Sequence, residues 1–204
     1  MSTSSSAAGP CSASATAATS TSALPLQQWT PRLLIIDHFD SYTANLLTLL
    51  PEHVAANTLI LQHTHPLVAD PARFALKVAP FIDAIIISPG PGSPENEADF
   101  GTAARVLQDC LRPAQDEHSI SPLRLPVLGV CLGHQGIACA LGARLKRTRA
   151  LQHGTCSALL WTKDSVVADA KQGNGILAGI AEGAQVVRYN SLTVDEHSEC
   201  WPCT

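Results

Sequence analysis

Residues 126–135 read Pro-Val-Leu-Gly-Val-Cys-Leu-Gly-His-Gln, and this stretch decides the fold that the sequence predicts. Its first half, Pro126–Val130, is apolar, as in a strand that is buried on both faces of a sheet. Its second half leads into a helical run from about His134 to Leu141. A strand that passes directly into a helix is typical of a βαβ unit, in which helices connect parallel strands.

The same alternation of apolar runs and helical patterns extends through the preceding hundred residues. Strands are expected at residues 33–37, 58–61, 84–88 and 126–130, with helices at 40–50, 71–78 and 100–111 between them. The sequence therefore predicts an α/β fold, a doubly wound and mostly parallel sheet with helices on both faces. Chemistry in such sheets lies at the carboxyl ends of the strands. Two of these ends carry unusual residues, Ser88–Pro94 and Cys131–Gln135.

Composition excludes several classes of protein. The chain has 204 residues, of which 46% are hydrophobic and 15% charged, enough for one domain with its own core. A net charge of −4 argues against a broad nucleic-acid surface. No apolar run approaches the roughly 18–20 residues needed to span a bilayer. Seven irregularly spaced cysteines and no secretory pattern at the N-terminus indicate reduced thiols and a cytoplasmic location.

The N-terminal 30 residues differ from the rest of the chain. They consist mainly of Ser, Thr and Ala, a composition that cannot bury a core, so residues 1–30 are predicted to be a disordered tail. An organelle transit peptide is the alternative, but such peptides usually carry Arg, and the first basic residue here is Arg32. Residues 31–204 are predicted to form the folded domain.

Gly129-Val130-Cys131-Leu132-Gly133 fits the Gly-x-nucleophile-x-Gly pattern of a nucleophile elbow, with cysteine as the nucleophile. The tight turn strains the backbone at the nucleophile, and the small residues on either side let neighbouring chain pass closely. A thiol at a helix N-terminus is expected to have a lowered pKa. The alternative is an ordinary buried cysteine. The predicted strand before the motif and the predicted helix after it favour the elbow over this alternative.

The second strand end, Ser88–Pro94, contains three prolines and two glycines and no lysine, so it is not a phosphate-binding P-loop. A backbone N–H from this loop, together with that of Leu132, could form an oxyanion hole for a tetrahedral intermediate. Without the elbow that is predicted beside it, the loop would be interpreted as an ordinary connection between a strand and a helix.

Four stretches carry a resemblance to a known family: Ile36–Leu46, Ser88–Pro94, Gly129–Gln135 and Val187–Leu192. In this order and at these intervals they resemble the class I (triad-type) glutamine amidotransferases. Within that class the sequence is most similar to the glutaminase component of the chorismate-using synthases, aminodeoxychorismate synthase and anthranilate synthase. The resemblance implies a flavodoxin-like sheet whose last strands are incomplete in this chain.

The resemblance also implies roles for individual residues. Cys131 would attack the carboxamide of L-glutamine, giving a glutamyl thioester and ammonia, and the backbone amides of Gly90 and Leu132 would hold the oxyanion. Gln135, expected at an exposed helix position, would bind the amino-acid end of glutamine with the backbone of Ser191 and Leu192. The substrate-binding set is Gly90, Pro91, Gly92, Gln135, Ser191 and Leu192. No cofactor and no metal are implied.

The sequence departs from the family pattern in two places. Asn190 stands where the family usually has His. The family's general base, a His followed after Pro by the orienting Glu, lies dozens of residues beyond this motif, whereas the chain has 12 residues after Leu192. His197-Ser198-Glu199 lacks the Pro and a preceding strand, so it is not expected to be the base. We therefore expect that the C-terminal part of the domain is missing and that this chain alone turns over slowly.

The leading hypothesis is a glutaminase domain that supplies ammonia to a chorismate-binding synthase, as a fused domain or a separate subunit. By resemblance alone, Ser41-Tyr42-Thr43 and Asn190 slightly favour aminodeoxychorismate, on the folate route to 4-aminobenzoate, over anthranilate, on the tryptophan route. The alternative of a different class is a catalytically incompetent amidotransferase-like domain that binds a partner.

Overall fold

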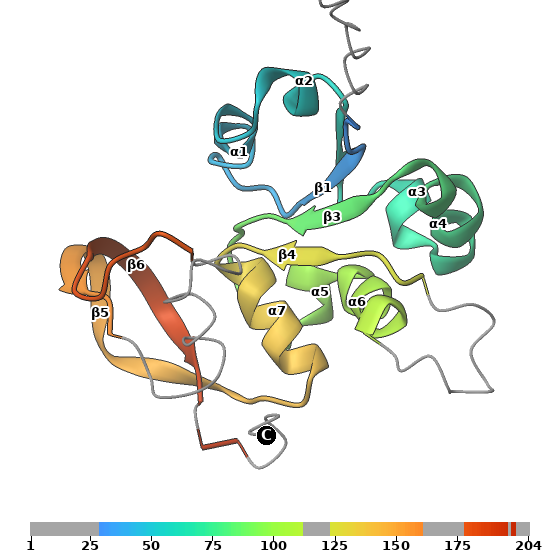
Figure 1. Ribbon diagram of the computed structural model, residues 1–204. Coiled ribbons are helices and arrows are strands. Elements are labelled where there is room, and N and C mark those ends of the chain that lie inside the picture. Colours follow the sequence, from blue (N-terminus) through green and yellow to red (C-terminus); the bar gives the residue numbers. More distant parts are fainter. Residues whose placement is uncertain (1–28, 112–122, 161–177, 196, 199–204) are drawn as a thin grey trace, which may run out of the picture.

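The computed structural model describes residues 29–111, 123–160, 178–195 and 197–198 (Figure 1). The predicted tail falls almost entirely outside these residues. Four parallel strands form the central sheet in the order β2-β1-β3-β4. They are β1 (Leu33–Asp37), β2 (Thr58–Gln62), β3 (Ala84–Ile87) and β4 (Val127–Gly129). The predicted mostly parallel sheet is confirmed, and each of its strands overlaps a strand expected from the sequence.

Helices lie on both faces of this sheet, as predicted. They are α1 (Asn45–Thr48), α2 (Glu52–Ala55), α3 (Pro66–Ala69), α4 (Pro71–Lys77), α5 (Glu97–Phe100), α6 (Ala103–Leu111) and α7 (Leu132–Ala140), with a 3₁₀ turn η1 (Ala79–Phe81). Figure 1 shows α1 and α2 on one side of the strands and α5, α6 and α7 on the other.

Alternate residues of the strands divide the core into two layers. Leu34 and Ile36 of β1, with Ile85 and Ile87 of β3, pack against α3 to α7 in the larger layer. Leu33 and Ile35 of β1, with Ile86 of β3, pack against the region of α1 and α2 in the smaller one. Because side chains alternate between the faces of a strand, uninterrupted apolar runs are what a sheet covered on both faces requires.

Two predicted helices are shorter than expected. The helix expected over residues 40–50 is reduced to the four residues of α1, because Asp40 forms a turn by accepting a 2.7 Å hydrogen bond from the N–H of Tyr42 and does not cap the helix. The helix expected over residues 100–111 begins only at Ala103, as α6, because Gly101, with φ 57°, ends the preceding α5 at Phe100.

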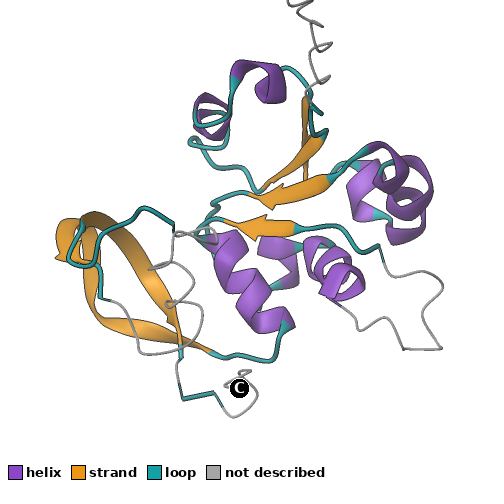
Figure 2. Cartoon of the chain, viewed as in Figure 1, coloured by secondary structure: helices purple, strands orange, loops and turns teal. Residues whose placement is uncertain are grey.

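A long antiparallel pair stands beside the parallel sheet (Figure 2). It consists of β5 (Leu145–Ala158) and β6 (Gln185–Val194), with irregular register between Arg147 and Gln152 and between His153 and Thr155. Burial alternates along β6, where Asn190 and Leu192 on one face are half-buried and Val187 and Tyr189 on the other face are exposed. In the part of the chain that the structure describes, no helix is both long and apolar enough to cross a membrane.

Candidate active site

Cys131 occupies the sharp turn between β4 and α7, with φ 52° and ψ −105°. A positive φ is unfavourable for a residue with a β-carbon and marks a strained turn. The residue is exposed and precedes the first turn of α7, where the N–H of Gln135 donates a 3.0 Å hydrogen bond to the carbonyl of Cys131. This backbone geometry is that of the predicted nucleophile elbow.

The two glycines of the motif are required by close approach of backbone. A β-carbon at Gly129 would collide with the carbonyl of Gly133 and with the backbone nitrogen of His134. A β-carbon at Gly133 would collide with the carbonyl oxygen of Ile87, at the end of the neighbouring strand. The spacing of the motif therefore reflects a steric need, which is that the first turn of α7 lies against both β3 and β4.

The electrostatics of Cys131 differ from the prediction. Burial of the thiol raises the pKa of Cys131 above its ordinary value even though the residue as a whole is exposed. The backbone N–H of Leu132 opposes this shift by hydrogen bonding to the sulfur, and the carboxylate of Asp40 adds to it. The expected lowering of this pKa is therefore wrong, because desolvation outweighs the hydrogen bond from Leu132 at the start of α7, and no cation among the described residues contributes to the shift.

The loop Ser88–Pro94 lies beside the elbow. Ile87 pairs with Gly129, and the N–H of Val130 donates a 3.0 Å hydrogen bond to the carbonyl of Ile87, so the chain leaves β3 and β4 at the same edge. A β-carbon at Gly90 would lie 2.6 Å from Cδ2 of Leu132. The structure thus brings together the two segments that were predicted to share an oxyanion hole.

One carboxylate fixes the far end of this loop. Oδ2 of Asp99 accepts hydrogen bonds from the backbone N–H of Ser93 at 3.0 Å and from Nδ2 of Asn96 at 3.1 Å. A β-carbon at Gly92, which has φ 82°, would overlap the carboxylate of Asp99. Sequence reasoning missed Asp99. The Asn-x-x-Asp spacing of a helix capping pattern at Asn96 was the available signal, although here Asp99 accepts from the side-chain amide of the cap residue and from the backbone N–H of Ser93.

Two buried histidines, His38 and His63, lie under the loop Ser88–Pro94, where a β-carbon at Gly90 would lie 2.6 Å from Cβ of His38. His38, 1% exposed, stacks on His63 with ring centroids 4.9 Å apart and on Phe100 with centroids 5.0 Å apart. Burial, with a smaller contribution from His63, lowers the pKa of His38 to about 4. The carbonyls of Phe100 and Ile36 oppose this shift, but within the described residues neither ring nitrogen of His38 has a hydrogen-bond partner. His38 is therefore neutral at pH 7.

Gln135 connects the elbow helix to the antiparallel pair. It is 8% exposed, which corrects the expectation of an exposed helix position. Its Nε2 donates a 3.2 Å hydrogen bond to the carbonyl oxygen of Leu192 on β6. Gln135 and Leu192 are 57 residues apart, and both were assigned to the same substrate-binding set. Ser191, beside Leu192, receives a 3.3 Å hydrogen bond on its carbonyl from the hydroxyl of Thr148.

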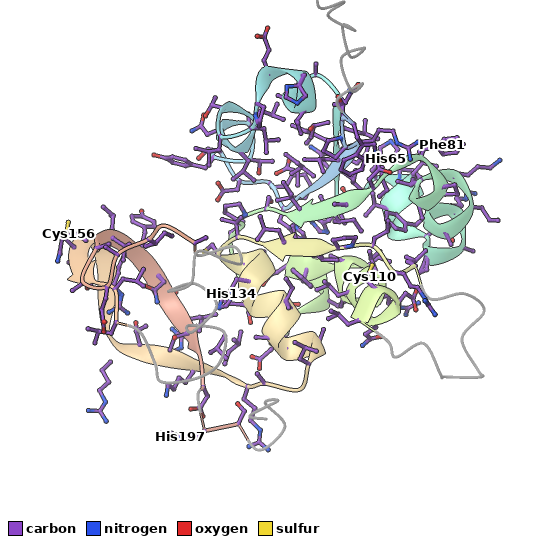
Figure 3. The ribbon with its side chains drawn as sticks, in the orientation of Figure 1. His65, Phe81, Cys110, His134, Cys156 and His197 are labelled. Carbon is purple, nitrogen blue, oxygen red and sulfur yellow. The ribbon has the colours of Figure 1, made fainter. Side chains whose placement is uncertain are left out.

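His197 lies far from the elbow. The N–H of Asp195 donates to the carbonyl of Arg144, and Arg144 follows the end of α7 that is opposite to Cys131. A helix of nine residues is about 13 Å long. Figure 3 shows His197 beyond this end and Cys156 at the remote end of the β5–β6 pair. Within the described residues, no cluster of three His, Cys, Asp or Glu could hold a metal ion.

Comparison with known proteins agrees with this geometry. The family model described as "Glutamine amidotransferase class-I" matches residues 34–204. An aminodeoxychorismate synthase of Streptomyces griseus is 37% identical over 166 residues, which cover 81% of this chain and 19% of that protein. Anthranilate synthase component 2 of Saccharolobus solfataricus is 34% identical over 165 residues, which cover 80% of this chain and 71% of that protein. The chain therefore spans about a fifth of the first relative and most of the second.

Solved structures share the fold. A glutamine amidotransferase from Thermotoga maritima superposes with a TM-score of 0.53 at 14% identity, covering 85% of this chain and 69% of the other. A glutamine amidotransferase from Methylobacillus flagellatus superposes with a TM-score of 0.52 at 18% identity, covering 81% and 57%. At these identities the likeness concerns the fold alone.

Proposed function

The chain belongs to the class I glutamine amidotransferase family, and from this premise we propose that it releases ammonia from L-glutamine through Cys131. The observation that carries the proposal is the positive φ of Cys131 at the carboxyl end of β4, beside the loop Ser88–Pro94. An amide-hydrolysing site needs a nucleophile, donors for the oxyanion and a way to hold the substrate. Cys131, the backbone N–H groups of Gly90 and Leu132, and Gln135 are assigned these roles.

The reaction has two halves. The thiolate of Cys131 forms a C–S bond to the carboxamide carbon, and the oxyanion that results accepts hydrogen bonds from Gly90 and Leu132. The C–N bond then breaks, and the nitrogen takes a proton and leaves as ammonia. Water cleaves the thioester to give glutamate and the free thiol. Both halves need an acid–base group, and among the described residues no histidine contributes to the pKa of Cys131.

We propose that the amino-acid end of glutamine binds between α7 and β6. Gln135 and the backbone of Ser191 and Leu192 would hold its ammonium and carboxylate groups, and Gly90-Pro91-Gly92 would line the pocket. Support comes from the hydrogen bond between Gln135 and Leu192, which places these elements in contact. It comes as well from the contact of Gly90 with Leu132.

The proposed acceptor of the ammonia is a chorismate-binding synthase, either fused to this domain or a separate subunit. Relatives named aminodeoxychorismate synthase and relatives named anthranilate synthase component 2 both match the chain, so both products have support. We favour aminodeoxychorismate slightly, because the relatives so named include the 37% identical protein. A cytoplasmic location is retained as part of the proposal.

A second candidate function has one observation in its favour. The raised pKa of Cys131 fits a domain that has kept the family fold for partner binding and no longer hydrolyses glutamine. The two functions differ in whether Cys131 reacts with a ligand of glutamine's shape.

The test is covalent labelling with the chloromethyl ketone analogue of L-glutamine, followed by peptide mapping. We expect saturable modification of Cys131, protection by L-glutamine and none by D-glutamine, and no adduct in Cys131→Ser. Modification spread over other cysteines, without protection, would overturn the glutaminase proposal and favour the partner-binding domain.

A further inference from the structure

Two side-chain amides from different elements meet at one carbonyl oxygen. Nε2 of Gln135, on α7, donates to the carbonyl of Leu192 at 3.2 Å. Nδ2 of Asn190, on β6, donates to the same oxygen at 3.0 Å. A carbonyl oxygen has two lone pairs, so these two donors use its full accepting capacity. The oxygen is thus held from the helix and from its own strand.

This arrangement fixes which end of the Gln135 amide is available to a ligand. The carbonyl of Leu192 can only accept, so it must face the NH₂ end of the amide. In the opposite orientation Oε1 would face another acceptor, which is repulsive. Within the described part of the chain, no donor is bound to Oε1 of Gln135. The atom left over is an acceptor, suited to the α-ammonium group of an amino acid.

Gln135 lies one helical turn from the nucleophile, as its N–H bonds to the carbonyl of Cys131 at 3.0 Å. A rotation of its amide would therefore change the binding of substrate close to the reacting atoms. Gln135 is buried and Asn190 is half-buried, so water competes little for these hydrogen bonds.

We infer that Asn190 is a positioning residue that, through the carbonyl of Leu192, holds the amide of Gln135 with its oxygen free for the ammonium group of the substrate. The inference rests on the proposed glutaminase function, since it concerns the same site. Asn190 donates within its own strand and fixes the direction of the carbonyl that Gln135 must meet. Position 190 therefore needs a side chain with a hydrogen-bond donor at the δ position. Asn has Nδ2 and His has Nδ1 there, whereas an ionised Asp has only acceptors.

The matched variants follow from that requirement. Asn190→Asp keeps the shape and replaces the donor by a carboxylate that repels the carbonyl. Asn190→His restores a ring N–H at the same distance from the backbone. Asn190→Ala is the milder substitution if the Asp variant does not fold. Val187→Ala, on the exposed face of β6, is the control.

The experiment uses three reagents on the 204-residue chain: the chloromethyl ketone analogue of L-glutamine, the same compound without its α-amino group, and iodoacetamide. In Asn190→Asp or Asn190→Ala we expect about a tenfold rise in the half-saturating concentration of the amino compound. We expect less than a twofold change in the half-saturating concentration of the des-amino compound. The maximal rate of labelling by either ketone, and the rate of labelling by iodoacetamide, should also change less than twofold. Asn190→His and Val187→Ala should stay within twofold of the unmodified chain.

The outcomes separate the inference from the function on which it rests. If the unmodified chain is not labelled saturably at Cys131, the proposed function fails. If it is labelled and the Asp and Ala variants bind both ketones as before, the inference is overturned and the function stands. Equal slowing with all three reagents would show a general structural role of Asn190 and would also overturn the inference.

Discussion

The α-carbon of Gly133 lies directly against the carbonyl group of Ile87, with no room for a β-carbon between them. This contact sets the first turn of α7 against the end of β3. As a result, the loop that follows β3 and the elbow that follows β4 share one edge of the sheet, although more than 30 residues separate them in the sequence. A candidate site built from both segments depends on this contact.

The strained turn predicts that glycine at position 131, the proposed nucleophile, stabilises the protein relative to alanine. Cys131 has φ 52°, so Cys131→Gly should be more stable to unfolding than Cys131→Ala, by about 1 kcal/mol. Cys139, within α7, is the control, since Cys139→Gly should be less stable than Cys139→Ala by about 1 kcal/mol. Denaturant unfolding of the four variants measures both differences. The same sign at both positions would contradict the strained elbow.

The raised pKa of Cys131 predicts that its alkylation depends steeply on pH. Only the thiolate reacts, so below the pKa the rate should rise about tenfold for each pH unit, from pH 7 to above pH 8.5. Burial raises the pKa of Cys110 to about 11, so Cys110 should stay largely unmodified at pH 9 and serves as the internal control. Iodoacetamide labelling followed by peptide mapping gives both rates. A rate for Cys131 that is already constant at pH 7 would contradict the raised pKa and show a thiolate that a neighbouring group stabilises.

The hydrogen bond from Ser93 to Asp99 predicts a loss of reactivity when the loop is released. Asp99→Ala should slow labelling of Cys131 by the glutamine chloromethyl ketone about tenfold, equivalent to about 1.4 kcal/mol, because Gly90 is no longer held in place. Asp99→Asn keeps an acceptor for the N–H of Ser93, so the rate of labelling of Cys131 should fall less in this variant. Exposed Glu95, replaced by Ala, is the control. An unchanged rate in Asp99→Ala would mean that the loop keeps its shape without this carboxylate.

Buried His38 predicts a loss of stability in mild acid. Its pKa is lowered to about 4 in the folded state, so the unfolded chain binds the proton more readily. The stabilising contribution is present above about pH 6.5 and is lost as the pH falls toward 4. Between pH 7.5 and pH 5, His38 should lower the free energy of unfolding by at most about 2 kcal/mol.

The difference in unfolding free energy between pH 7.5 and pH 5, measured with denaturant, tests this expectation. It should shrink in His38→Asn and be unchanged in His53→Ala, which replaces an exposed histidine. His63, whose pKa is also lowered by burial, acts in the same direction, so some of the pH dependence should remain in His38→Asn. Equal pH dependence in all three proteins would mean that His38 does not contribute.

The position of His197 predicts that it takes no part in the chemistry. It follows Asp195, which binds the backbone of Arg144 at the end of α7 away from Cys131. Ammonia release from glutamine should therefore be the same in His197→Ala and in the unmodified chain, and close to background in both. Substantial release that His197→Ala abolishes would show that this histidine reaches the sulfur in solution.

The parallel strands and the elbow could be predicted from the sequence because their signals are local. Uninterrupted apolar runs such as Leu33–Asp37 specify a strand covered on both faces, and the Gly-x-Cys-x-Gly spacing specifies a turn that only small neighbours permit. The loop Ser88–Pro94 could be located for the same reason, since its prolines and glycines are contiguous in the sequence.

The interactions between these segments were decided by the tertiary structure alone. No local pattern reveals that Gln135 meets the carbonyl of Leu192, 57 residues away. The direction of the pKa shift of Cys131 also depended on the folded neighbours. A helix N-terminus is visible in the sequence, but desolvation is produced by atoms that only folding brings around the sulfur, and here desolvation is the larger effect.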